Sequence, residues 1–278
     1  MSVESLPYTL LLLAAQFTAG MAAAILYVQL RGRFEPGFLR ACSWLTVTGA
    51  LATTLTALAI DPVANAAGYR LDPDFLDPAR AAAMALFLFS CAHFVLIRRE
   101  EEAFLAQATG ATTVGLGAIL LVLLASLVNP PAWSVAGVLL TMFAGAASMG
   151  VFMVAMIWGH WYLVNPKLEE GPLIELTTIA MGVIAFELVT TAINAIIPVG
   201  TPFESDALLA VSLPSNPAFW LRIGIGIVFP AALAFMAYKS SQEKSMMSAT
   251  GLLYIAVGAI LAGEALGRGL LFVTGAPV

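Results

Sequence analysis

The sequence predicts an all-α integral membrane protein, a bundle of about eight transmembrane helices. Of its 278 residues, 60% are hydrophobic and 10% are charged, whereas soluble domains carry about 25% charged residues. The mean hydropathy is +0.93. The apolar residues lie in runs long enough to cross a bilayer, which takes roughly 20 residues in a helix. These runs fill most of the chain, so we expect a single polytopic membrane domain over residues 1–278.

The expected helices are joined by links that are mostly short. The start of the chain, MSVESLP, is acidic and lacks the basic residues of a signal peptide, so the first run is expected to be a retained helix. Small residues inside the runs, as in ATGATTVGLGA (108–118), allow neighbouring helices to approach closely. We place the eight helices near 7–30, 40–60, 80–97, 104–128, 133–163, 172–198, 218–238 and 248–274.

A weak internal similarity links the first and fifth helices. GMAAAILYVQLRGRFEPGFL (20–39) and GVFMVAMIWGHWYLVNPKLEEGPL (150–173) both pass from small residues to an aromatic, polar exit containing Pro and Gly. A genuine repeat would give two four-helix halves of the same orientation. The alternative is that membrane helices of similar composition resemble one another.

The basic residues of the links gather on one predicted side of the membrane. The positive-inside rule makes that side cytoplasmic and places both termini outside. We therefore expect a multi-pass protein of a bacterial inner (cell) membrane. The basic residues concerned are Arg31, Arg33, Arg40, Arg98, Arg99, Lys167, Lys239 and Lys244.

Charged side chains also occur inside the predicted spans, where each costs about 2.5–3.5 kcal/mol and is a functional hypothesis by default. With a rise of 1.5 Å per residue, Glu187 and Glu264 lie roughly 16 and 15 Å from the outer ends of their helices. Arg222 and Arg268 lie shallower on the same side, and Gln16 falls in the same half. The outer half of the bundle is therefore expected to have a polar interior.

Two interpretations of these residues remain open. In the first, Arg268 neutralises Glu264 four positions away and Arg222 neutralises Glu187. In the second, Glu187 and Glu264 are catalytic proton carriers, and Gln16, Arg222 and Arg268 bind the oxygen of a lipophilic quinone or quinol. Transport of a solute or an ion would use the same residue types.

His93 and His160, the two histidines of the chain, lie near the predicted cytoplasmic ends of helices that run in the same direction. Rings at one depth on one side of the membrane would suit the axial ligands of a single heme b. A quinone or partner contact is a second candidate. His160 also lies among aromatic residues, including Trp158 and Trp161, as at an ordinary membrane interface.

The sequence lacks the motifs of several functional classes. It contains no phosphate-binding loop, dinucleotide fingerprint, metalloprotease helix, serine-nucleophile elbow or CxxC motif. Cys42 and Cys91 both lie inside apolar runs, which is typical of small buried side chains and not of a disulfide or metal site. The basic residues are too few and too scattered for nucleic acid.

Two segments resemble a known family. AVGAILAGEALGRGLLF (256–272) is similar to the last helix of the membrane-anchor subunits of dimethyl-sulfoxide reductase type, and ESLPYTLLLLAAQFTAGMAAA (4–24) is similar to their first helix. These anchors belong with the polysulfide-reductase, NrfD-like group. The resemblance implies a quinone-interacting subunit without a metal of its own, with Gln16, Glu264 and Arg268 near the quinone.

Together these features predict an integral-membrane subunit of a respiratory or photosynthetic electron-transfer complex. It would exchange electrons and protons with a membrane quinone or quinol and, surrounded by membrane lipid, would anchor an iron–sulfur, molybdopterin or hydrogenase-like redox partner. The alternatives are a proton-coupled secondary transporter of a small solute and a non-catalytic structural membrane subunit.

Overall fold

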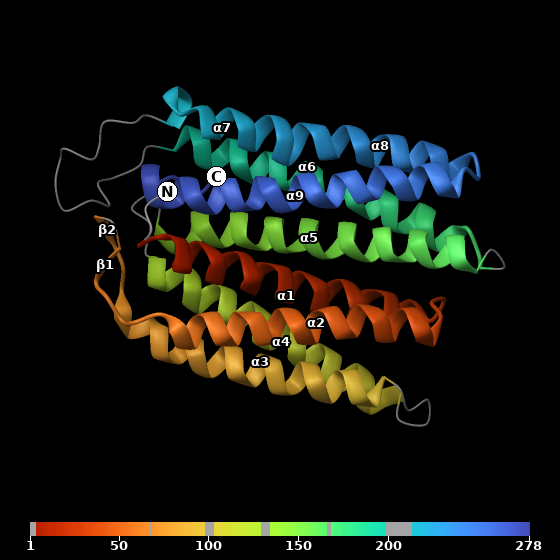
Figure 1. Cartoon of the computed structure of the whole chain (residues 1–278), viewed down its shortest axis with the longest axis horizontal. Helices are drawn as coiled ribbons and strands as arrows, with labels where there is room; N and C mark the ends of the chain where they lie inside the picture. Colours follow the sequence, from red (N-terminus) through yellow and green to blue (C-terminus); the bar gives the residue numbers. More distant parts are fainter. Residues whose placement is uncertain (1–3, 67, 98–102, 129–133, 166–167, 198–212) are drawn as a thin grey trace.

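The computed structural model describes residues 4–66, 68–97, 103–128, 134–165, 168–197 and 213–278. Within these ranges the chain forms long helices that lie side by side (Figure 1). Eight helical spans among the described residues are long and apolar enough to cross a membrane. The predicted fold class, an all-α bundle of about eight transmembrane helices, is therefore confirmed.

The observed helices match the predicted ranges to within four residues at each end. The seventh span is composite, because α7 (Pro217–Leu221) continues through a π-helical turn (Arg222–Val228) into α8 (Phe229–Gln242). A short hairpin of β1 (Asn65–Ala66) and β2 (Tyr69–Arg70) lies between α2 and α3. The other helices are α1 (Leu6–Arg31), α2 (Pro36–Ala59), α3 (Leu76–Leu96), α4 (Ala103–Val128), α5 (Ser134–Val164), α6 (Gly171–Ile196) and α9 (Met246–Thr274).

Prolines mark several of the helix starts. Pro36 opens α2 four residues before the predicted start, directly after Glu35 in extended conformation. Proline is favoured at a first helical position because its missing N–H would have no partner there and its φ is already helical. Pro217 opens α7 in the same way, and the Asn216 side chain accepts a hydrogen bond from the Ala218 N–H at 3.0 Å.

The helices are arranged as two four-helix halves. The first half consists of α1 to α4, in which each helix contacts the next and α4 also contacts α1 (Figure 1). The second half repeats this pattern with α5, α6, the α7–α8 span and α9, and α9 contacts α5. The halves meet mainly through α1 and α5. This contact is very close, since a Cβ added to Gly150 would lie 2.1 Å from the Gly20 carbonyl oxygen. These two glycines begin the two similar segments of the sequence.

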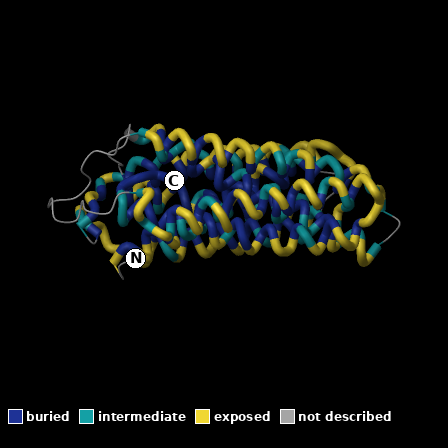
Figure 2. Tube along the Cα trace, turned by 90° about the horizontal axis from the view of Figure 1, so that it is seen from above, coloured by how far each residue is buried: buried dark blue, intermediate teal, exposed yellow. Residues whose placement is uncertain are grey.

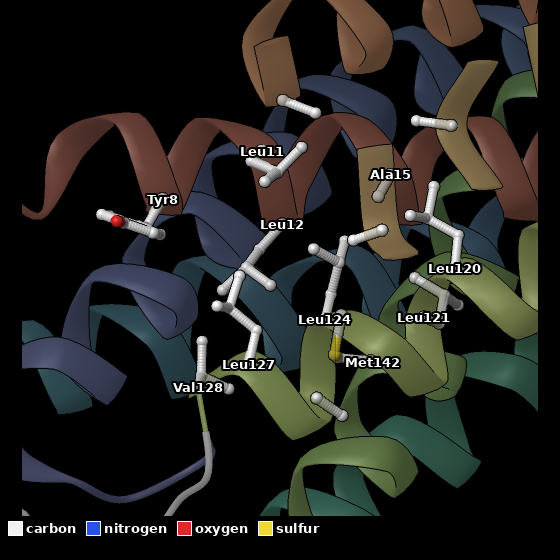
Figure 3. Close-up of a cluster of buried hydrophobic side chains, with 14 of the residues drawn as sticks. Tyr8, Leu11, Leu12, Ala15, Leu120, Leu121, Leu124, Leu127, Val128 and Met142 are labelled. Atoms are coloured by element: carbon white, nitrogen blue, oxygen red, sulfur yellow. The ribbon is translucent and has the colours of Figure 1, made fainter. Parts of the chain in front are cut away.

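The apolar interior runs along the length of the bundle. Figure 3 shows Leu12 of α1 pointing towards Leu127 of α4, with Leu124 of α4 and Met142 of α5 beside them in the same buried cluster. Buried residues line the middle and exposed ones the outside (Figure 2). Many exposed side chains are large and apolar, as expected where the outer surface contacts lipid and not water. They include Leu55, Leu88, Phe104 and Val164.

Both ends of the described chain lie at the same end of the bundle, as an even number of spans requires (Figure 1). The β1–β2 hairpin lies there too, so we refer to this as the hairpin end. The α1–α2, α5–α6 and α8–α9 links lie at the opposite end, which is the predicted cytoplasmic side. Arg98, Arg99 and Lys167 of the predicted basic set fall outside the described residues.

Candidate functional site

A cluster of polar side chains is buried between the two halves, in the part of the bundle nearer the hairpin end. We call it the ion cluster. Its members come from five spans and each is at most 1% exposed, so the predicted polar interior is present. The cluster comprises Gln16 of α1, Thr141 of α5, Glu187 of α6, Arg222 of the π-helical turn, and Glu264 and Arg268 of α9.

Glu264 is the centre of the ion cluster. Its Oε1 atom accepts a hydrogen bond from Arg222 Nη2 at 2.7 Å. Its Oε2 atom accepts one from Arg268 Nη2 and another from Gln16 Nε2, each at 3.0 Å. Arg268 is held further by Thr141, whose hydroxyl and carbonyl oxygens both lie at 3.3 Å. Three donors thus fix the buried Glu264 carboxylate.

Glu187 is held less firmly. Its Oε1 atom lies 2.7 Å from Arg222 Nη2, the nitrogen that also donates to Glu264. The short distance makes this an ion pair, although the N–H does not point along it. Among the described residues neither Glu187 oxygen accepts a hydrogen bond of good geometry, and the Ser148 hydroxyl of α5 lies beside this carboxylate. Residue counting predicts the two carboxylates at the same depth. In the structure both pair with the same arginine, Arg222.

Several donors and acceptors of the ion cluster remain available. Within the described ranges, Arg222 Nε and Nη1, Arg268 Nε and Gln16 Oε1 have no hydrogen-bond partner. A buried polar atom without a partner costs about 1–3 kcal/mol. Such atoms are therefore the ones that a polar ligand or a trapped water would be expected to satisfy.

The π-helical turn explains how Arg222 reaches the interior. Pro230 has no N–H to donate to the Gly226 carbonyl, and its ring crowds that oxygen, so the preceding turn widens. One extra residue in a turn rotates the preceding part of the helix, which carries Arg222, by about 100° around the helix axis. Gly226 and Gly263 then let the two helices close over the guanidinium, since a Cβ on Gly263 would lie 2.2 Å from the Gly226 Cα.

The two histidines are placed apart from the ion cluster, and each has its own partner. His93 is buried, and its Nε2 atom lies 3.0 Å from Gln29 Oε1 of α1. The ring also packs on α4, where a Cβ added to Gly110 would lie 3.1 Å from the same nitrogen. His160 is exposed, and its Nδ1 atom lies 3.0 Å from the Tyr254 hydroxyl of α9.

These contacts do not fit heme ligation at His93 Nε2, because Gln29 and α4 fill the space in front of that nitrogen. A separate kind of site, a group of three or more His, Cys, Asp or Glu able to hold a metal ion, is absent from the part of the chain described here. The shared heme b at His93 and His160 stays a prediction that an absorbance spectrum decides.

A second polar group, not predicted from the sequence, lies at the opposite end of the bundle. The Tyr27 hydroxyl donates to the Glu175 carboxylate, and Arg31 Nε donates to the same oxygen at 2.6 Å. We call these three residues the interfacial triad. It lies at one end of an apolar groove of about 380 Å³ between α1, α5 and α6. The groove is lined mainly by Gly20, Ala23, Ala24, Ala147, Val151 and Ile179.

The sequence contained only part of the signal for this group. Tyr27 and Arg31 are four residues apart and so share a helix face, but Glu175 lies 148 residues from Tyr27. The contact between Thr141 and Arg268 was not predicted either. A threonine in a membrane helix often bonds its own backbone, so its presence does not indicate a partner on another helix.

Comparison with known proteins adds no identification: no protein-family model matches this chain, and no curated protein is significantly similar to it. The resemblance to NrfD-like anchors therefore stays a prediction.

Proposed function

We propose that the protein is a membrane subunit of an electron-transfer complex that exchanges electrons and protons with a membrane quinone or quinol. It would anchor an iron–sulfur or molybdopterin-containing partner in a bacterial inner membrane, with both termini outside. Support comes from the multi-pass fold and from the chemistry of the ion cluster. The resemblance of residues 4–24 and 256–272 to NrfD-like anchors points the same way.

The observation that carries this proposal is the unequal coordination of the two buried acids. Glu264 is fixed by three donors, whereas Glu187 pairs with one cation, Arg222, and accepts no hydrogen bond of good geometry among the described residues. A carboxylate held by one ion pair and no well-aligned hydrogen bond can take up and release a proton while its neighbours keep their positions. In this proposal Glu187 is the proton carrier, and Glu264 keeps Arg222 and Arg268 in place.

A bound quinol supplies two electrons and two protons when it is oxidised to the quinone. The electrons would go to the redox centre of the partner subunit, since the chain has no cofactor-binding motif of its own. The protons would go to carboxylates of this chain and then to water. Arg222 and Arg268 have unsatisfied N–H groups that would donate to a carbonyl or hydroxyl oxygen, and the unsatisfied Gln16 Oε1 would accept a hydrogen bond from a hydroxyl group.

The test uses the full chain, affinity-tagged and purified from its native membrane in a mild detergent. We expect it to copurify with a subunit that carries an iron–sulfur or molybdopterin centre. The complex should then transfer electrons from a short-chain quinol to a dye. Glu187→Gln should lower this activity at least tenfold, while Glu243→Gln, at an exposed position, should leave it unchanged. A chain that purifies alone and binds no quinone would overturn the proposal.

A second candidate, a proton-coupled transporter, is favoured by the two similarly folded halves. Transporters are often built from two repeats related by an axis along the membrane normal, with the site near the midplane between them. The ion cluster draws residues from both halves, since Gln16 belongs to the first and the other members to the second. Glu187 would then be the group that couples proton and solute movement.

Reconstitution separates the two candidates. In liposomes with an imposed pH gradient, a transporter would move protons together with a solute, and Glu187→Gln would stop that movement. An electron-transfer subunit would leave the gradient intact with or without the substitution.

A further inference from the structure

We propose that Thr191 relays protons from Glu187 to the hairpin end of the bundle, along a buried polar face of α6. This inference rests on the proposed function, in which Glu187 takes protons from the quinol, and specifies how those protons leave the ion cluster. Thr191 is completely buried in α6 and lies about one turn beyond Glu187, towards the hairpin end.

The Thr191 hydroxyl differs from every other threonine hydroxyl among the described residues. Each of the others donates to a backbone carbonyl three or four residues earlier in the chain, as Thr190 does to the Glu187 carbonyl. This is a common bond for a threonine inside a helix. The buried Thr191 hydroxyl has no hydrogen-bond partner in the part of the chain that the structure describes. It can therefore accept one hydrogen bond and donate another, as a proton relay must.

Thr191 and Glu187 lie on one face of α6. They are four residues apart, so their Cβ atoms are roughly 5–6 Å from each other. Within the described ranges, neither the Thr191 hydroxyl nor the Glu187 carboxylate has a hydrogen bond of good geometry. One water molecule between them would bond both groups, since internal water binds buried polar atoms that lack other partners.

This arrangement would carry the protons of a quinol in single steps. When the quinol is oxidised, its two O–H bonds break, two electrons pass to the redox centre of the partner subunit, and Glu187 takes the two protons one after the other. Each proton passes from the Glu187 carboxyl group to the bridging water, which gives up a proton to the Thr191 hydroxyl oxygen. The proton that Thr191 releases in turn moves on towards the hairpin end.

The polar face of α6 continues to Asn194, two residues before the helix ends. The Asn194 Nδ2 atom donates to the Gly137 carbonyl of α5 at 2.9 Å and to the Pro277 carbonyl at 2.8 Å. Asn194 thus holds α5, α6 and the segment after α9 together at the outer end of the route. Glu187 lies nine residues from the end of α6, so the route is about 14 Å long.

The opposite direction along α6 offers no comparable side chains next to Glu187. Three, four and seven residues before Glu187, this face carries Ile184, Val183 and Ala180. Hydrocarbon side chains neither accept nor donate a proton. The neighbouring polar side chains of α6 therefore lead from Glu187 towards the hairpin end.

The experiment measures electron transfer from a short-chain quinol to a dye by the purified complex, in H2O and in D2O. Thr191→Val removes the hydroxyl and keeps the shape of the side chain. We expect it to lower kcat about tenfold with KM unchanged, the effect of one lost hydrogen bond on the path of the proton. The ratio of the rates in H2O and D2O should rise, because proton transfer then limits the reaction. Thr191→Ser keeps a hydroxyl and should retain the wild-type rate and ratio.

The matched control is Thr177→Val. Thr177 is also completely buried in α6, but it lies ten residues before Glu187, and its hydroxyl donates to the Leu173 carbonyl at 2.9 Å. This substitution should leave the rate unchanged. Size-exclusion profiles and melting temperatures check that each variant is folded, and Thr191→Ala takes the place of Thr191→Val if the valine variant does not fold.

The outcomes separate the two proposals. If the wild-type complex oxidises the quinol and Thr191→Val lowers the rate no more than Thr177→Val does, Thr191 is not a relay, although the proposed function stands. A lower rate with an unchanged isotope ratio, not restored in Thr191→Ser, would indicate a packing defect and would also overturn the inference. If the wild-type complex does not oxidise quinol at all, both proposals fall.

Discussion

Arg222 and Glu264 form an ion pair at 2.7 Å in which both side chains are completely buried. Arg222 also pairs with Glu187, and Arg268 pairs with Glu264, so two acids and two bases cancel in formal charge inside the bundle. Removing one partner of a buried ion pair leaves an uncompensated charge, which costs about 3–5 kcal/mol. The ion cluster should therefore be sensitive to single substitutions, and its two acids should respond differently.

Glu264→Gln should destabilise the protein by about 3–5 kcal/mol, because Arg268 loses its only carboxylate among the described residues and Arg222 keeps only the weaker partner. Thermal unfolding in detergent, followed by circular dichroism, measures the loss. Glu187→Gln should cost less, since Arg222 keeps its hydrogen bond to Glu264. Equal losses for the two variants would contradict the unequal coordination on which the proposed function depends.

Gly145→Ala should disrupt the ion cluster without changing any charge. The added Cβ would lie 2.1 Å from Glu264 Oε2 and 2.7 Å from Gln16 Nε2. These atoms cannot easily move away, because Arg268 and Gln16 both hold the same carboxylate oxygen. We expect a loss of about 1–3 kcal/mol, as for other overpacked cores, and a lower activity in any assay that Glu187→Gln affects.

The control is Gly258→Ala in α9, where an added Cβ meets no atom within 4 Å. This substitution should leave activity unchanged and alter stability by no more than about 1 kcal/mol, in the stabilising direction. If Gly145→Ala behaved like Gly258→Ala, the close packing around Glu264 would not be present in the membrane.

The depth of each buried charge could be predicted from the sequence, because a helix rises by a fixed distance per residue. Counting placed Glu187 and Glu264 at one level, and both now meet Arg222. The pairing could not be predicted, because it depends on how each helix is rotated about its axis. The π-helical turn before Pro230 changes that rotation, and a regular helical count does not include it.

The interfacial triad could not be predicted from the sequence for a different reason. Tyr27, Arg31 and Glu175 each look like ordinary residues at a membrane surface, where tyrosine and basic side chains are common. They form a site only because α1 and α6 lie on either side of α5, and this arrangement depends on the packing of the whole second half. The two histidines show that residues at similar predicted depth need not form one site. His93 contacts Gln29, whereas His160 contacts Tyr254.

The reduced protein should show no b-type α band in its absorbance spectrum. His93 Nε2 already contacts Gln29 at 3.0 Å and packs against Gly110, so a heme iron would have to displace both. The measurement is a dithionite-reduced minus oxidised difference spectrum of the purified chain. An α band that disappears in His93→Ala but persists in Cys91→Ala, a substitution two residues away in the same helix, would show that the heme prediction is right and that this contact rearranges.

The hairpin end should face outwards, because the basic residues of the links lie mainly at the opposite end. Single cysteines at exposed positions can test this after Cys42 and Cys91 are replaced by alanine. Asp74→Cys, in the turn before α3, should react with a membrane-impermeant maleimide in intact cells. Glu243→Cys, between α8 and α9, should react only after the membrane is permeabilised. The reverse pattern would invert the topology and place the interfacial triad on the outer surface.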